Sequence, residues 1–308
     1  MLRYLLPFFL LISGLTYSQT DTLMSVNGTQ LFVHTEGKGE PLLIIHGGPG
    51  MNQTYLQPWL SKLSKKHTLI YVDLRSMGRS ALSIRDSMNL PTFARDLDAL
   101  RQALGYDHWQ VMAHSFGTTI GLYYAQAFPG TVSDLALVSP VPLDRSFDRN
   151  MAELMQLRIT PEDSIYRTTL LGNGMHTPGL DTMELLMKLS VKLVFCDTAR
   201  VNRFTIDLPD NYMVASLSYA GFGDLRTRYD LHAIATSANQ ATRITVFHGP
   251  CDIIPLEAAA AIRDDHQVVS LKNVVIIHSL NGRVISCGWW KKHCNLPGPF
   301  LSSCLESF

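Results

Sequence analysis

The chain has 308 residues, of which 46% are hydrophobic and 17% are charged, which suits one α/β domain with an inserted segment. Its 26 basic residues balance 26 acidic residues, so the composition gives no support to nucleic-acid binding or to attraction by an anionic membrane surface. The sequence contains no internal repeat and no low-complexity tract.

The first 18 residues are typical of a secretory signal peptide. Arg3 supplies a positive charge, an apolar stretch runs from Leu5 to Ile12, and Thr16-Tyr17-Ser18 offers a cleavage site before Gln19. The apolar stretch is too short for a membrane span, and no cysteine directly follows it to carry a lipid anchor. We therefore expect a periplasmic or secreted protein, with no stable membrane insertion after the signal peptide is removed.

After this segment, short apolar runs alternate with helix-like stretches. A hairpin is predicted at Leu23–Val26 and Leu31–His34, joined by the Asn27-Gly28 turn. Strands and helices then alternate as follows: strand 42–45, helix about 55–64, strand 68–72, helix 92–104, strand 109–112, a helix to about 128, and strand 132–138. This alternation predicts an α/β fold with a mainly parallel central sheet and helices on both faces.

The alternation stops between residues 141 and 230, where apolar residues such as Met183, Leu186 and Met187 recur at helical spacing. We predict a helical cap here, inserted between two parts of the core at residues 19–140 and 231–280. The second part is predicted to contain strand 243–247, helix 256–264 and strand 268–277. Residues 281–308 form an atypical tail.

The most informative motif runs from Gln110 to Thr119, where an apolar run ends at Ser115 and a stretch of small residues follows. This order is typical of a nucleophile elbow, a sharp strand-to-helix turn that lifts a serine hydroxyl clear of the sheet. Ala113 and Gly117 supply the small side chains that such a crowded turn requires. Ser115 is therefore the candidate nucleophile, although an S-x-G triplet alone is equally compatible with an ordinary turn.

A second motif, His46-Gly47-Gly48-Pro49-Gly50, directly follows the predicted strand 42–45. Such a loop can aim backbone N–H groups at the oxygen of a tetrahedral intermediate, and its glycines allow the close approach. An ordinary Gly/Pro turn accounts for one of the two motifs but not for both in this order. We therefore expect a serine hydrolase scaffold in which the N–H groups of Gly48 and Phe116 form the oxyanion hole.

Together with the stretch from Asp73 to Ser80 and the segment His248-Gly249-Pro250-Cys251-Asp252, these motifs resemble those of α/β-hydrolases. Within that superfamily they resemble the proline iminopeptidase-like group, over roughly residues 23 to 280. The resemblance implies an α/β-hydrolase fold in which Ser115 attacks a carbonyl carbon and forms an acyl-enzyme. It also implies that Asp252 orients the catalytic histidine and that Asp73 belongs to a structural turn.

The catalytic histidine is not found in the form that the resemblance requires, which is a Gly-His-Phe segment after the last strand. His278 instead lies at the end of the predicted strand 268–277, closer to it than in the family, and His293 lies in the tail. The catalytic histidine is therefore unassigned, with His278 as a candidate.

The tail differs from a closing amphipathic helix, because it holds three of the five cysteines and two of the four tryptophans. Back-translation of Asn281 to Lys292 in a shifted frame permits the reading Trp-Pro-Gly-His-Phe-Leu-Trp-Leu-Val-Glu-Lys, which contains the missing segment. We hypothesise that the tail from about residue 281 is a frameshift product.

Three functions stay open. The resemblance implies a serine hydrolase that releases N-terminal residues such as proline from small peptides, through a cap that presents carboxylates, often beside tryptophan, to the substrate amine. This cap has no tryptophan, and its glutamates are Glu153, Glu162 and Glu184. A carboxylesterase or other amide hydrolase is the alternative enzyme, and a triad-deficient binding protein or defective gene product is the alternative of another class. We expect a small peptide or ester substrate, no nucleic-acid partner, and no cofactor or metal.

Overall fold

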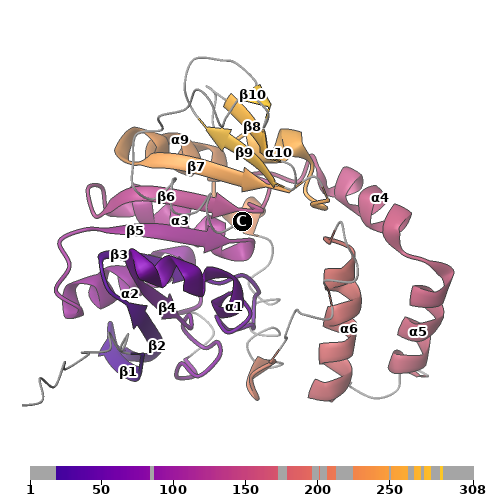
Figure 1. Ribbon diagram of the computed structural model, residues 1–308, viewed down its shortest axis with the longest axis horizontal. Coiled ribbons are helices and arrows are strands. Elements are labelled where there is room, and N and C mark those ends of the chain that lie inside the picture. The colour runs from indigo at the N-terminus through magenta and orange to yellow at the C-terminus, as the bar shows by residue number, and fades with distance from the viewer. Residues whose placement is uncertain are drawn as a thin grey trace, which may run out of the picture.

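A computed structural model of the protein describes a three-layer arrangement in which one sheet lies between helices (Figure 1). The predicted signal peptide and His293 lie outside the described residues. None of the helices described is both long and apolar enough to cross a membrane. The described residues are 19–83, 87–172, 179–195, 201, 207–212, 225–249, 251–262, 267–271, 274–278 and 285–286.

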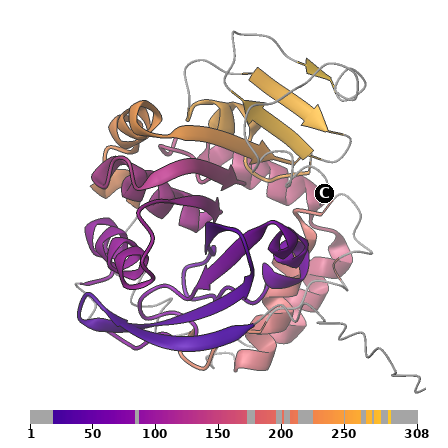
Figure 2. The same cartoon turned by 60° about the vertical axis from the view of Figure 1, so that its left-hand side comes forward.

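The sheet has ten strands in the order β1-β2-β4-β3-β5-β6-β7-β9-β8-β10, and both views show it running from indigo at one edge to yellow at the other (Figure 1, Figure 2). The pairs β3·β4, β3·β5, β5·β6 and β6·β7 are all parallel, which confirms the mainly parallel α/β sheet. The strands are β1 Thr20–Val26, β2 Thr29–Gly37, β3 Glu40–Ile45, β4 His67–Val72, β5 Trp109–His114, β6 Val132–Val138, β7 Arg243–His248, β8 Gln267–Leu271, β9 Val274–His278 and β10 Ile285–Ser286.

The central strands carry buried apolar residues on both sides because helices cover both faces of the sheet. In β3, Leu43 and Ile45 pack on the side of α2, α3 and α9, whereas Leu42 and Ile44 pack on the side of α1 and η1. Continuous apolar strands of this kind are expected in parallel sheets that are buried on both sides. These helices are α1 Gln57–Leu60, the 3-10 helix η1 Ser61–Lys65, α2 Leu90–Ala103, α3 Phe116–Ala127 and α9 Leu231–Ala241.

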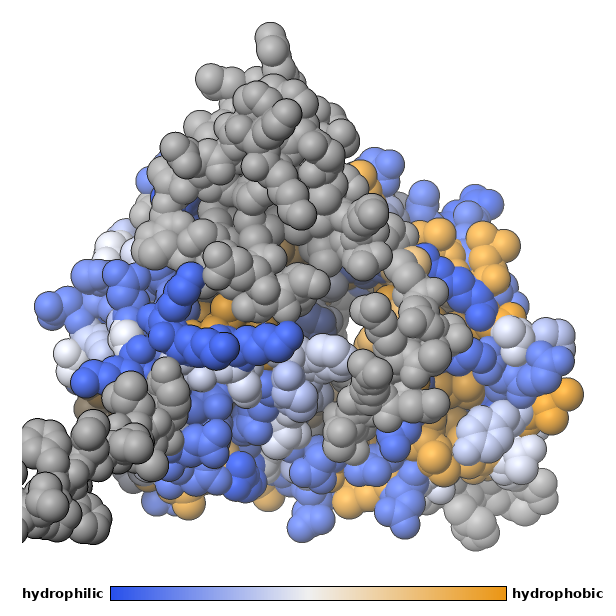
Figure 3. Space-filling view, viewed as in Figure 1, coloured by the Kyte–Doolittle hydropathy of each residue, from blue (hydrophilic) through white to orange (hydrophobic). Residues whose placement is uncertain are grey.

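Between residues 141 and 230, the described residues form helices, turns and loops and no strand. Figure 1 shows α4, α5 and α6 beyond the tips of β5, β6 and β7, and Figure 3 shows apolar side chains exposed over them at the right of the molecule. Lys192 at the end of α6 binds Asp163 of α5 at 2.7 Å, which joins these two helices. The helices are α4 Asp148–Arg158, α5 Pro161–Leu171, α6 Leu180–Lys192 and α8 Leu225–Arg228, and the domain limits at 141 and 230 stay a prediction.

The prediction of one strand over residues 268–277 is wrong. The structure has two strands there, β8 and β9, which pair antiparallel with Leu271 opposite Val274. The polar pair Lys272-Asn273 interrupts the apolar run, and two residues suffice to connect antiparallel strands. As a result β9 is antiparallel to β7 and runs away from the edge at which β7 ends.

Candidate active site

Ser115 lies between the end of β5 and the start of α3, in a backbone conformation that few non-glycine residues adopt. Its φ is 50° and its ψ is −122°. Such a conformation costs on the order of 1–3 kcal/mol and persists only where the surroundings fix it. Here the Ser115 N–H donates to the Val138 carbonyl at 2.9 Å, and the Ser115 carbonyl accepts from the Thr118 N–H at 2.9 Å. The strand-turn-helix geometry expected of a nucleophile elbow is therefore present.

The elbow packs directly on the His46–Gly50 loop, so the two motifs form one site. A Cβ atom added to Gly47 would lie 3.1 Å from the Ser115 Cβ atom, and one added to Gly117 would lie 2.5 Å from the His46 carbonyl oxygen. Both glycines are thus required by close approach rather than by backbone angles. Gly48 and Phe116, the expected oxyanion donors, adjoin these two contacts in the chain.

His46 is fully buried and fixes the shape of this loop. Its Nδ1 donates to the Gly47 carbonyl at 2.6 Å, and its Nε2 accepts from the Leu74 N–H at 3.1 Å. Burial lowers the pKa of His46 to about 4, so the ring is neutral at pH 7 and both ring nitrogens are satisfied. His46 is therefore a structural residue that ties the loop to the turn after β4.

The turn from Asp73 to Ser80 supports the same loop. The buried Asp73 carboxylate accepts from the Gln53 N–H at 3.0 Å and from the Arg79 N–H at 2.9 Å. Burial raises the pKa of Asp73 to about 6. With both oxygens engaged by backbone, Asp73 is a structural residue, as the resemblance implies.

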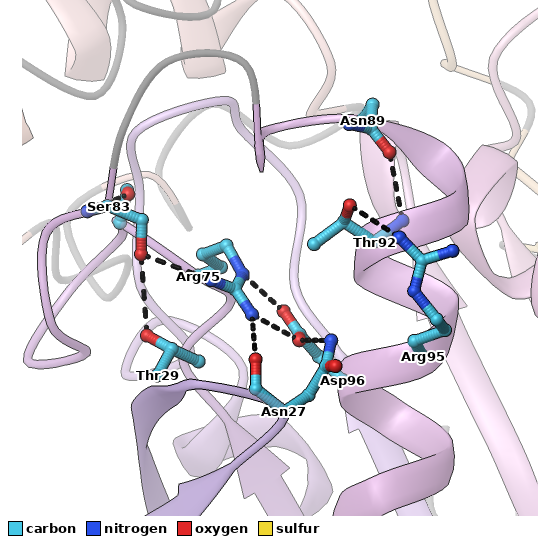
Figure 4. A network of polar contacts seen from close by, with 9 residues as sticks. Asn27, Thr29, Arg75, Ser83, Asn89, Thr92, Arg95 and Asp96 are labelled. Carbon is cyan, nitrogen blue, oxygen red and sulfur yellow. Dashed lines mark hydrogen bonds and ion pairs between the residues drawn. The ribbon is translucent and has the colours of Figure 1, made fainter.

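Arg75 of this turn forms a buried ion pair with Asp96 of α2, shown with its neighbours in Figure 4. The guanidinium donates to both Asp96 oxygens, at 2.7 and 2.6 Å, and to the Asn27 carbonyl at 2.9 Å. This network joins α2 to the hairpin of β1 and β2 and to the turn that holds the His46 loop.

His114, the residue before the nucleophile, is paired with Tyr55. The Tyr55 hydroxyl lies 2.7 Å from His114 Nδ1 and accepts from the Gly47 N–H at 2.7 Å. Burial lowers the pKa of His114 to about 4, against a small opposing effect of Asp252, and it raises the pKa of Tyr55. Sequence analysis does not predict this pair, because Tyr55 lies 59 residues before His114.

Asp252 follows β7 at the edge where β5 also ends. Its N–H donates to the Gly249 carbonyl at 3.1 Å, and one carboxylate oxygen, Oδ1, accepts from the Ile254 N–H at 3.1 Å. The other oxygen, Oδ2, is buried and has no hydrogen-bond partner among the described residues. An imidazole N–H would satisfy this acceptor, which is what a residue that orients a catalytic histidine requires.

A carboxylate on the neighbouring strand, Asp134, lies near the start of β6, away from the strand ends that carry Ser115 and Asp252. It pairs with Arg243 at the start of β7, whereas Asp252 follows the end of that strand. Asp252 is thus a carboxylate near the elbow with a buried oxygen that accepts no hydrogen bond from a described residue.

The structure does not bring His278 to this edge. In β9, Val275 lies opposite His248 and Ile277 opposite Val246, so the strand leads away from Asp252. Three residues along a strand correspond to about 10 Å, which separates the His278 backbone from the edge at which β7 ends. The course of β9 therefore does not bring His278 to the strand ends that carry Ser115 and Asp252.

Two cavities meet at Asp252. One, of about 340 Å³, is mostly apolar and has Tyr55, Trp59, His114 and Asp252 among its lining residues. The other, of about 470 Å³, lies between α4 and helix α10 Leu256–Ala260 and is lined in part by Glu153. The described residues hold no cluster of side chains that could bind a metal ion.

The cap glutamates differ in their surroundings. Glu153 is exposed and pairs with Arg149 at 2.8 Å, and Glu184 accepts from the Leu208 N–H at 3.1 Å. Glu162 is exposed on α5. Glu153 is the one of these three that lines a cavity together with Asp252.

Comparison with known proteins agrees with this geometry. Residues 40–164 match a family model described as alpha/beta hydrolase fold. Two solved structures share the fold over 94% of this chain: an alpha/beta fold family hydrolase from Bacillus anthracis, with a TM-score of 0.60 and 12% identity over 99% of its chain, and a proline iminopeptidase from Mycobacterium smegmatis, with a TM-score of 0.58 and 14% identity over 96% of its chain. The chain has the α/β-hydrolase fold.

Within that fold, part of the sequence is similar to proline iminopeptidases. A proline iminopeptidase from Heyndrickxia coagulans is 32% identical over 123 residues, 38% of this chain and 42% of the relative. Another from Xylella fastidiosa is 33% identical over 105 residues, 32% of each chain, and a soluble epoxide hydrolase from Corynebacterium is 30% identical over 120 residues, 38% of this chain and 40% of that protein. The chain therefore matches less than half the length of these relatives.

Proposed function

We propose that this protein is a serine hydrolase that works through an acyl-enzyme, with Ser115 as nucleophile and Asp252 as the carboxylate that orients a histidine. The contact between the strained elbow and the His46–Gly50 loop carries this proposal, because it joins a nucleophile to a source of oxyanion donors. The N–H groups of Gly48 and Phe116 are the proposed donors. Loss of one such donor typically costs about 3 kcal/mol of transition-state stabilisation.

The proposed reaction is release of N-terminal residues such as proline from small peptides. The similarity to proline iminopeptidases supports this substrate class. So does the cavity between α4 and α10, which is lined by both Asp252 and Glu153, because Glu153 pairs with Arg149 through Oε1 and could bind a substrate amine through its other oxygen.

A carboxylesterase or other amide hydrolase is the second candidate, and the apolar cavity of about 340 Å³ favours it. Its histidine, His114, is neutral at pH 7 because burial lowers its pKa to about 4. Such a cavity suits an uncharged apolar group better than a charged peptide terminus.

The test compares two versions of the protein. The printed chain has the sequence given above, and the restored chain has its tail replaced by the shifted-frame reading that contains Gly-His-Phe. Each is treated with a fluorophosphonate probe and assayed on a proline amide and on a short-chain aryl ester. Ser115→Ala should abolish labelling. Ser133→Ala, a control at the start of β6 and away from the elbow, should leave labelling unchanged. Equal labelling of Ser115→Ala and its parent would reject the nucleophile.

The tail hypothesis makes a separate prediction for the same assay. Without a base near Ser115 the hydroxyl keeps its proton, so the printed chain should hydrolyse both substrates far more slowly than the restored chain. Equal rates would mean that another histidine serves and that the frameshift has no functional consequence. Absence of hydrolysis and labelling in both versions would favour the non-catalytic alternative.

We also propose export with removal of the first 18 residues. Expression in a Gram-negative host with amino-terminal sequencing of the periplasmic product should give Gln19 as the first residue. A product that retains Met1 in the cytoplasm would contradict this proposal.

A further inference from the structure

Arg158, in the last turn of α4, connects the cap to the loop that carries Asp252. Its Nη1 donates to the Leu193 carbonyl at 2.6 Å, at the end of α6, and also to the Cys251 carbonyl. Its Nη2 lies 3.4 Å from the Asp252 carbonyl oxygen. One side chain thus holds two cap helices and the loop after β7 together.

The acceptors that Arg158 uses are backbone carbonyls, and no described carboxylate pairs with it. A guanidinium presents several N–H donors in a fixed plane, which suits carbonyls that come from separate segments. The contacts therefore fix the course of the backbone rather than neutralise a charge.

The other described hydrogen bonds of this loop are local to it. Asp252 bonds Gly249 and Ile254, and His248 Nε2 donates to the Ile254 carbonyl at 2.6 Å. Cys251 is in addition disulfide-bonded. Local hydrogen bonds set the shape of the loop, and Arg158 links the loop to the cap by hydrogen bonds, beside whatever the disulfide of Cys251 contributes.

We propose that Arg158 is a positioning residue that places the Asp252 carboxylate for the reaction at Ser115 and couples that placement to the cap. The inference rests on the proposed function, because it assigns Asp252 the orienting role. A displacement of about 1 Å in such a group can cost about a hundredfold in rate, so removal of the guanidinium should lower kcat while KM changes little.

The test uses Arg158→Gln, Arg158→Lys and the control Arg167→Gln, which removes an exposed arginine from α5. Hydrogen exchange of peptides that cover residues 249–256, measured on the full printed chain without reductant, should rise at least about tenfold in Arg158→Gln. Arg158→Lys should restore part of the protection, and Arg167→Gln should match the parent. Unchanged exchange in Arg158→Gln, or an equal rise in Arg167→Gln, would contradict the proposal that Arg158 holds the loop that carries Asp252.

A double-variant cycle separates positioning from general support of the fold. In the restored chain, Arg158→Gln should lower kcat by about ten- to a hundredfold, but it should add little in an Asp252→Asn background, because both changes act on one group. If the decreases in kcat of Arg158→Gln and Asp252→Asn multiply in the double variant, Arg158 does not act by positioning Asp252. If no version hydrolyses a substrate or is labelled at Ser115, the proposed function fails, and the positioning role of Arg158 in catalysis fails with it. The exchange measurement still decides whether Arg158 holds the loop that carries Asp252.

Discussion

Replacement of Gly117 by alanine should disrupt the contact that makes one site of the two motifs. The new Cβ would lie 2.5 Å from the His46 carbonyl oxygen and 2.9 Å from the Ile45 carbonyl oxygen, whereas ordinary contact begins at 3.4 Å. Backbone of β3 or α3 must therefore move by about 0.9 Å. Overpacking typically costs about 1–3 kcal/mol, and we expect about 3 kcal/mol here because both neighbours are backbone.

For a chain of 308 residues, that loss corresponds to a decrease in Tm of about 5 °C. The shift should also separate Gly48 from Phe116 and slow fluorophosphonate labelling of Ser115 by about a hundredfold, as for loss of one oxyanion donor. Gly121→Ala is the matched control on the same helix. Its Cβ would meet Ala113 Cβ at 3.1 Å and Leu135 Cδ1 at 3.2 Å, so its neighbours need to move by only a few tenths of an ångström. A Gly117→Ala protein that melts within about 2 °C of its parent and labels at the same rate would refute the packing argument.

Asp96→Ala should cost about 3–5 kcal/mol in urea denaturation because it leaves the buried Arg75 charge unpaired, and the double variant Arg75→Met/Asp96→Leu should lose less. A double variant less stable than Asp96→Ala would contradict this. Asp252→Asn in the restored chain should lower kcat by about 10⁴ without a change in Tm, because the histidine would take the wrong tautomer. Unchanged turnover would mean that Asp252 does not orient the histidine. His46 and His114 have folded-state pKa values of about 4, below the unfolded value of about 6.5, so the unfolded chain binds more protons between these pH values. Stability should therefore fall as the pH falls from 6.5 to 4, by about 3 kcal/mol for each ring, against an opposing gain of about 3 kcal/mol from Asp73, whose pKa is raised to about 6, and a flat profile would refute the burial of both rings.

Much of the fold is predictable from local sequence because the central strands are buried on both faces. Runs such as Leu42 to Ile45 are apolar throughout, and a parallel sheet requires such runs. The elbow and the glycine loop are predictable for a related reason, since both depend on small residues at fixed positions beside a strand. The hairpin of β8 and β9 is not predicted, because the mostly apolar runs on both sides of Lys272-Asn273 together have the pattern of one long strand.

The polar connections of the site are not predictable in this way. Tyr55 and His114 are 59 residues apart, and Arg158 lies 93 residues before Cys251, the residue whose carbonyl it binds. No local pattern marks a tyrosine that hydrogen-bonds the residue before a nucleophile, or an arginine that binds only backbone. Such partners depend on how distant segments pack. The catalytic roles of Ser115 and Asp252 stay predictions, which the geometry supports but does not test.

The two aspartates that follow strands at this edge indicate what the tail should contribute. Both oxygens of Asp73 accept backbone N–H bonds, whereas Asp252 has one buried oxygen without a described partner. A buried acceptor that stays unpaired costs about 1–3 kcal/mol, so a histidine N–H that reaches Asp252 should stabilise the fold as well as supply the base. The restored chain should therefore exceed the printed chain both in Tm and in the labelling rate of Ser115, and replacement of the restored histidine by alanine should reverse both gains. A gain in labelling without any gain in stability would mean that the histidine does not bond to the buried oxygen of Asp252.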